Sequence, residues 1–104
     1  MLNKIWDEVE FVNILETRSI EGKFLKLTEE LGELAAEVIA MQGQTYKDFN
    51  REKLVEEMAD TLLMVYSIFS ELLKMSGSTK LDLFTSCESK MIKWKEKIKD
   101  YKVK

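Results

Sequence analysis

Apolar residues recur at three- and four-residue intervals along most of the chain, and this spacing predicts four α-helices. The expected helices cover about residues 2–16, Ile20 to Gln42, residues 51–75, and Leu81 to about Tyr101. With four glycines and no proline, the composition also favours long helices over a sheet with many turns. The sequence therefore predicts an all-α fold, and 104 residues suit a single domain, 1–104.

Local signals support these helix boundaries. Ser19 and Asn50 are suitable N-caps for the second and third helices, and Gly43 is a plausible stop after the second. The third helix is apolar almost all round, a pattern typical of a helix enclosed by protein on every side. Four short helices cannot enclose one of their own completely, so we expect a homodimer or homotetramer that forms a helical bundle.

Composition narrows the possible chemistry. The net charge of −3 argues against binding of a nucleic-acid polymer through a basic surface. No segment has the roughly 20 apolar residues of a membrane span. Cys87 is the only cysteine, so no disulfide can form within the chain, and we expect a cytoplasmic protein. We expect Cys87 to be a small buried residue. The absence of histidine excludes Ser-His-Asp and Cys-His catalysis, and it leaves oxygen ligands for any metal, which suits magnesium, manganese or calcium.

Two pairs of acidic residues, Glu30/Glu33 and Glu57/Asp60, lie three residues apart on consecutive predicted helices. Residues at that spacing are neighbours on one helix face, so antiparallel helices would bring up to four carboxylates together. Both pairs border apolar stripes, where carboxylates are costly to dehydrate unless they are paired or bound to metal. The pattern alone fits either a metal site or a salt-bridged helix edge.

The residues around these pairs resemble a known family. Glu29-Glu30-Leu31-Gly32-Glu33, followed by Glu57-Met58-Ala59-Asp60, is similar to the E-E-x-x-E … E-x-x-D signature of the MazG-like all-α nucleoside triphosphate pyrophosphohydrolases. The interval between the motifs and the layout of the whole chain are similar too. The resemblance implies cleavage of a nucleoside triphosphate to the monophosphate and pyrophosphate. It also implies dimers or tetramers with the site near a subunit interface.

The resemblance further implies roles for particular residues. Magnesium, with manganese as an alternative, would be held by Glu30, Glu33, Glu57 and Asp60. Without histidine, the general base would be a carboxylate or a metal-bound hydroxide, and the candidates are Glu29, Glu30 and Glu33. Family members commonly place Lys, Asn or Arg on the closing helix to contact phosphate, but this chain has no Asn after Asn50 and no Arg after Arg51. The lysines of that helix would have to replace them, namely Lys90, Lys93 and Lys97.

Several other residues have both a functional and a structural interpretation. Lys23 and Lys26, one turn before the motif, could stabilise leaving-group charge, or they could pair with acidic residues one turn away. Trp6 could stack on a nucleobase or belong to the core, and the same holds for Phe11, Tyr66 and Trp94. Two other functions remain open: a non-catalytic helical oligomerisation module, and a related all-α dUTP or dCTP diphosphatase.

Overall fold

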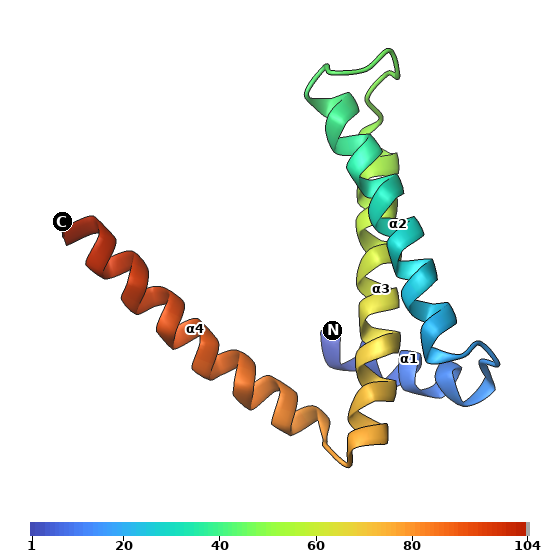
Figure 1. The fold of residues 1–104 in the computed structure, drawn as a ribbon, viewed down its shortest axis with the longest axis vertical. Coiled ribbons are helices and arrows are strands. Elements are labelled where there is room, and N and C mark those ends of the chain that lie inside the picture. The colour runs from blue at the N-terminus through green and yellow to red at the C-terminus, as the bar shows by residue number, and fades with distance from the viewer. Residues whose placement is uncertain (104) are drawn as a thin grey trace. The chain divides into compact units, whose positions relative to one another are not determined.

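The computed structural model describes residues 1–103, and side chains as far as residue 99. Four helices follow one another: α1 (Leu2–Leu15), α2 (Ile20–Met41), α3 (Arg51–Ser76) and α4 (Lys80–Val103) (Figure 1). No strand occurs in the described part of the chain, so the predicted all-α fold with four helices is confirmed. None of the helices described here combines the length and apolar character needed to cross a membrane.

The helix boundaries follow from local chemistry. The hydroxyl of Ser19 accepts a hydrogen bond from the backbone N–H of Gly22 (3.1 Å), and Asn50 Oδ1 accepts one from the N–H of Lys53 (3.0 Å). Both predicted N-caps are therefore confirmed. Gly43 follows α2 with φ of 70°, a left-handed conformation that glycine adopts without a steric penalty.

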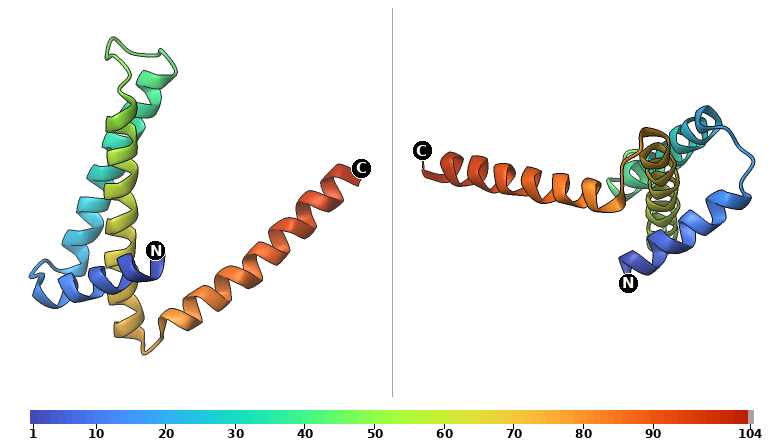
Figure 2. Two further views of the ribbon diagram at one scale, coloured as in Figure 1. Left: turned by 180° about the vertical axis from the view of Figure 1, so that it is seen from behind. Right: turned by 90° about the horizontal axis from the view of Figure 1, so that it is seen from below.

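The chain divides into two compact units, Met1–Glu71 and Leu72–Lys104. In the first unit, α2 and α3 form an antiparallel hairpin, and α1 crosses that hairpin near the start of α2 (Figures 1 and 2). The second unit contains the last turn of α3, a turn at Gly77 (φ 73°), and α4. A capping box starts α4, because Thr79 and Asp82 exchange hydrogen bonds between side chain and backbone N–H in both directions.

Trp6 and Ile68 are the largest fully buried apolar side chains of the first unit, each 1% exposed. The Trp6 ring packs at a tilt of 58° against Tyr66, with ring centroids 5.1 Å apart. A polar network lies nearby: the Asn13 amide donates to the carbonyl of Ser67 (3.0 Å) and to the hydroxyl of Ser70 (2.6 Å). These contacts fasten α1 to α3 across a separation of more than 50 residues.

The helices of the first unit do not enclose the third helix. Glu57 and Ile68 are its buried residues, while the other apolar positions of α3 are intermediate or exposed. Exposed large side chains include Val55, Met58, Leu62, Leu63, Phe69, Leu72 and Met75. The expectation that Cys87 is buried was wrong for the chain as described, since its thiol is exposed. The apolar pattern of α4 suggested burial, but a pattern does not say what covers a helix.

Candidate metal centre

Two antiparallel helices bring three predicted ligands together. Glu30 and Glu33 of α2 and Glu57 of α3 each offer a carboxylate oxygen, and these oxygens all lie within 4.8 Å of one another. Glu30 and Glu57 are buried, with 6% and 3% of their surface exposed, while Glu33 is exposed. We call this group the glutamate cluster.

Two oxygens of the glutamate cluster are buried without a hydrogen-bond donor, namely Oε2 of Glu30 and Oε2 of Glu57. A buried carboxylate oxygen normally has a partner, because dehydrating it without one is costly. A side-chain hydrogen bond between Glu33 and Glu57 raises the pKa of Glu33, and repulsion between the two adjacent carboxylates raises it further. The cluster therefore has unsatisfied negative charge and hard oxygen donors, which is the chemistry that a divalent cation requires.

Asp60, the fourth predicted ligand, is exposed and lies outside the glutamate cluster. It is one turn beyond Glu57, about 4.5 Å further along the helix axis. Its side chain is also one methylene shorter than that of glutamate. Glu30 and Glu33 have the same spacing on α2 and both belong to the cluster, so spacing alone does not exclude Asp60.

Lysines offset part of this charge. Lys26 Nζ lies 3.1 Å from Oε1 of Glu30 and 3.4 Å from Oε1 of Glu29. Lys53 Nζ lies 3.4 Å from Oε1 of Glu57, and these carboxylates raise the pKa of both lysines. The structural interpretation of Lys26, pairing one turn away on its own helix, is thus confirmed. The role of Lys53 was missed, although its i,i+4 spacing to Glu57 is a sequence signal.

One turn beyond Glu33 on α2, Glu37 is fully buried and pairs through Oε1 with the ammonium group of Lys47. Lys47 belongs to the segment between α2 and α3. No spacing rule links a helix residue to a residue of an irregular segment, so this pair could not be predicted from the sequence.

Lys23 does not join the glutamate cluster. Its ammonium group is buried between the three helices of the first unit, 2.7 Å from Glu71 Oε2 and 2.9 Å from Asn13 Oδ1. The lysine is 1% exposed, so it is committed to an internal ion pair rather than presented to a substrate. Sequence reasoning could not find this pairing, because it depends on how α1 crosses α3.

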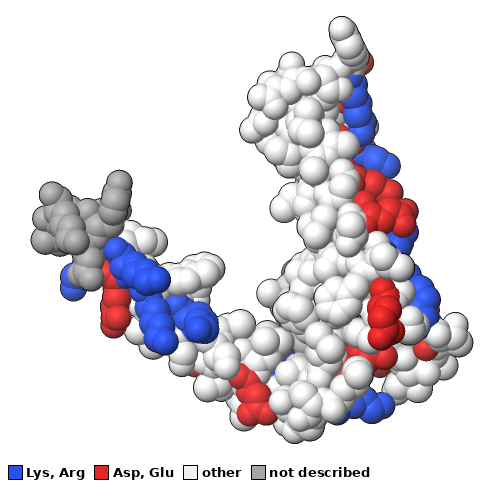
Figure 3. Space-filling view, in the orientation of Figure 1, with Lys and Arg blue, Asp and Glu red and all other residues white. Residues whose placement is uncertain are grey.

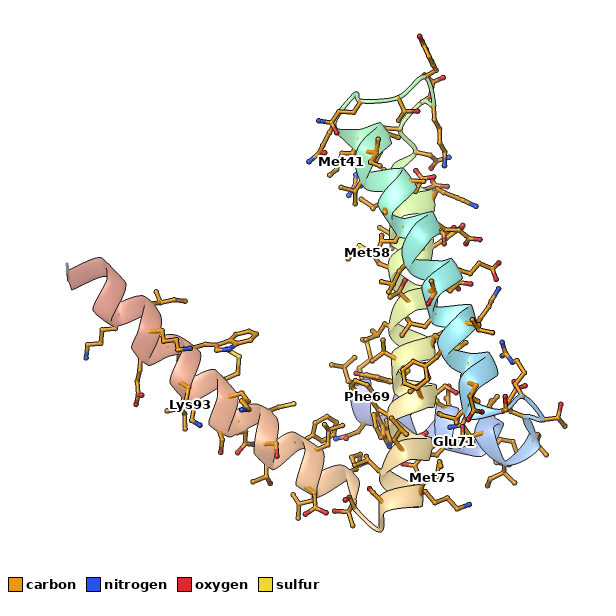
Figure 4. The ribbon with its side chains drawn as sticks, in the orientation of Figure 1. Met41, Met58, Phe69, Glu71, Met75 and Lys93 are labelled. Atoms are coloured by element: carbon orange, nitrogen blue, oxygen red, sulfur yellow. The ribbon has the colours of Figure 1, made fainter. Side chains whose placement is uncertain are left out.

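The remaining candidates are distributed between the two units. Trp6 is core rather than pocket, and its indole N–H donates to Glu10. Glu29 is exposed at the rim of the cluster beside Lys26. Lys90 and Lys93 are exposed on α4 of the second unit, where Figure 4 labels Lys93.

Comparison of the chain with known protein families, with curated proteins and with solved structures finds no match.

Proposed function

We propose that this protein is a divalent-metal-dependent nucleoside triphosphate pyrophosphohydrolase of the MazG-like kind, releasing the monophosphate and pyrophosphate. The observation that supports this most is the glutamate cluster, which joins three of the four predicted metal ligands. Oε2 of Glu30 and Oε2 of Glu57 are buried without a donor, as are those of the salt-bridged Glu37 and Glu71, and the two in the cluster are available to a cation.

In this proposal Glu30, Glu33 and Glu57 hold magnesium, and manganese suits the same oxygen donors. Asp60 lies one turn away on α3 and would complete the set if its side chain turned towards Glu57. When bound, the ion links these carboxylates to phosphate oxygens and offsets the negative charge of the triphosphate.

Glu29 is the carboxylate of the motif that is left over when the ligands are assigned. Its side chain is 58% exposed, and Lys26 Nζ lies 3.4 Å from its Oε1. We assign to it the role of accepting the proton of the attacking water, whose oxygen bonds to phosphorus as the anhydride bond to pyrophosphate breaks.

We also propose that the protein acts as a homodimer or homotetramer. Large apolar side chains are exposed along both α2 and α3 of the first unit, including Leu25 at 73% and Met58 at 53%. In the face shown in Figure 3, charged side chains follow one edge of the α2–α3 pair, and uncharged residues cover the other (Figure 4 labels Met41, Met58 and Phe69 there). A second copy of this chain suits such a surface, since contiguous apolar patches normally mark interfaces.

The rival proposal is a helical oligomerisation module whose acidic edge is merely salt-bridged. The pairs of Lys26 and Lys53 with the buried glutamates are the observation in its favour. Two experiments distinguish the enzyme from the oligomerisation module. The first is thermal unfolding with and without magnesium, and the second is a screen of common and damaged nucleoside triphosphates for monophosphate formation. A magnesium-dependent rise in melting temperature and turnover of at least one nucleotide support the enzyme. Neither effect is expected of the module. The same screen would reveal a dUTP or dCTP diphosphatase.

A further inference from the structure

Each buried glutamate of the cluster has one lysine, placed four residues earlier on its own helix. The Lys26 and Lys53 side chains keep 36% and 50% of their surface exposed, whereas the Glu30 and Glu57 side chains keep 8% and 4%. The ammonium groups therefore sit at the solvent rim while the oxygens that they neutralise sit inside. Such lysines can turn away into solvent without unpacking the helices.

Because α2 and α3 are antiparallel (Figure 2), the two lysines flank the glutamate cluster at opposite ends. Four residues of helix span about 6 Å, which puts the lysine backbones roughly 12–16 Å apart along the pair. Each lysine side chain extends about another 6 Å towards the centre. Both ammonium groups can thus reach one extended polyanion that is bound over the cluster.

Lysines and a divalent cation compete for the same carboxylates. A bound divalent cation would add two positive charges beside these three glutamates. The attraction that holds the lysines to Glu30 and Glu57 then weakens, while phosphate oxygens attached to the cation offer new acceptors. Charge-assisted hydrogen bonds to phosphate are among the stronger ones in proteins.

We propose that Lys53, with Lys26 opposite it, is an exchangeable counterion: it neutralises Glu57 in the metal-free protein and contacts a phosphate oxygen of the substrate once a divalent cation has replaced it. This inference rests on the proposed function and adds to it a residue that binds the triphosphate chain. In the metal-free protein, the lysines offset part of the cost of burying the Glu30 and Glu57 carboxylates.

The test compares Lys53→Met and Lys53→Arg with the wild type. Lys74→Met, at an exposed lysine in the last turn of α3, is the matched control. Mn²⁺ alone is titrated into each protein, followed by inorganic triphosphate at saturating Mn²⁺, both by calorimetry. We expect Lys53→Met to bind Mn²⁺ about two- to fivefold more tightly, because an exposed competing ion pair is lost. We expect its affinity for the triphosphate to fall about tenfold. Lys53→Arg should retain most of that affinity.

The inference is overturned if Lys53→Met binds both Mn²⁺ and triphosphate as the wild type and Lys74→Met do. Lys53 would then be an ordinary helix-stabilising lysine, and the proposed function would stand on the wild-type titration. If the wild type itself binds no Mn²⁺, the proposed function and this inference both fail. Circular dichroism of each variant checks that its helices are intact.

Discussion

Replacing Glu57 by glutamine should stabilise the metal-free protein and remove its response to magnesium. Glu57 is 3% exposed, and its Oε2 has no donor. A buried polar atom without a partner costs about 1–3 kcal/mol. The ion pair between Glu57 and the half-exposed Lys53 stabilises the folded protein by only about 0.3–0.5 kcal/mol. The amide keeps the size of the side chain and supplies a donor that can reach the adjacent carboxylate of Glu33.

The difference between these contributions predicts a net stabilisation of about 1–2 kcal/mol, or roughly 5–10 °C in melting temperature for a domain of this size. Magnesium at 100 times its dissociation constant should stabilise the wild type by about 2.7 kcal/mol and leave Glu57→Gln almost unchanged. The assay is thermal unfolding by circular dichroism, with EDTA and with magnesium.

Two companion variants sharpen this comparison. Glu56→Gln removes an exposed carboxylate next to Glu57 in the chain and should behave as the wild type does in both buffers. Asp60→Asn should change the metal-free melting temperature little, because Asp60 is exposed and outside the cluster. Both Asp60→Asn and Glu57→Gln should abolish turnover. The reasoning is refuted if Glu57→Gln melts below the wild type in EDTA and still responds to magnesium.

Three further predictions concern the first unit. Lys23→Met should lower the free energy of unfolding, measured by chemical denaturation with or without metal, by about 1–3 kcal/mol, because it removes the cation that pairs with Glu71 and donates to Asn13. An unchanged denaturation midpoint would argue against a structural role of Lys23. Leu63→Glu should reduce the mass measured by light scattering to that of one chain, whereas a wild type that is already monomeric at micromolar concentration contradicts the oligomer. Arg18 lowers the pKa of Glu16 to about 2 from 4.5, so the stability that this pair contributes is present above about pH 4.5 and is lost as the pH falls towards 2. The difference in melting temperature between wild type and Arg18→Met should shrink over that range, and a difference independent of pH would show that the pair contributes nothing.

The helices were predictable because their signals are local. Apolar spacing locates each helix, and a capping side chain such as Ser19 or Asn50 acts within three residues of itself. The glutamate cluster was predictable for a similar reason, since i,i+3 pairs on consecutive antiparallel helices can meet across a single hairpin.

Other features depend on geometry that no short stretch of sequence encodes. The burial of Lys23 requires Asn13 and Glu71 to converge from helices far apart in the chain. Glu37 pairs through Oε1 with Lys47 from an irregular segment, whose path has no periodicity. Asp60 stays outside the cluster although its spacing from Glu57 equals that of Glu33 from Glu30, so spacing along the sequence does not decide which carboxylates meet.

The exposure of α3 has a different origin. Its apolar residues predict burial, and that pattern is equally compatible with contacts inside one chain and contacts between chains. In the described chain, residues such as Leu62 and Leu63 are exposed. Only a measurement of mass in solution separates the two sources of burial.

Product identity tests the central claim most directly. The wild type is incubated with each nucleoside triphosphate of a broad panel, with magnesium, with manganese and with EDTA, and the products are identified by phosphorus NMR. We predict monophosphate and pyrophosphate in equal amounts from at least one nucleotide, only in the presence of metal, and none from Glu57→Gln. Release of orthophosphate and diphosphate instead, or no monophosphate from any nucleotide with either metal, would contradict the proposed function.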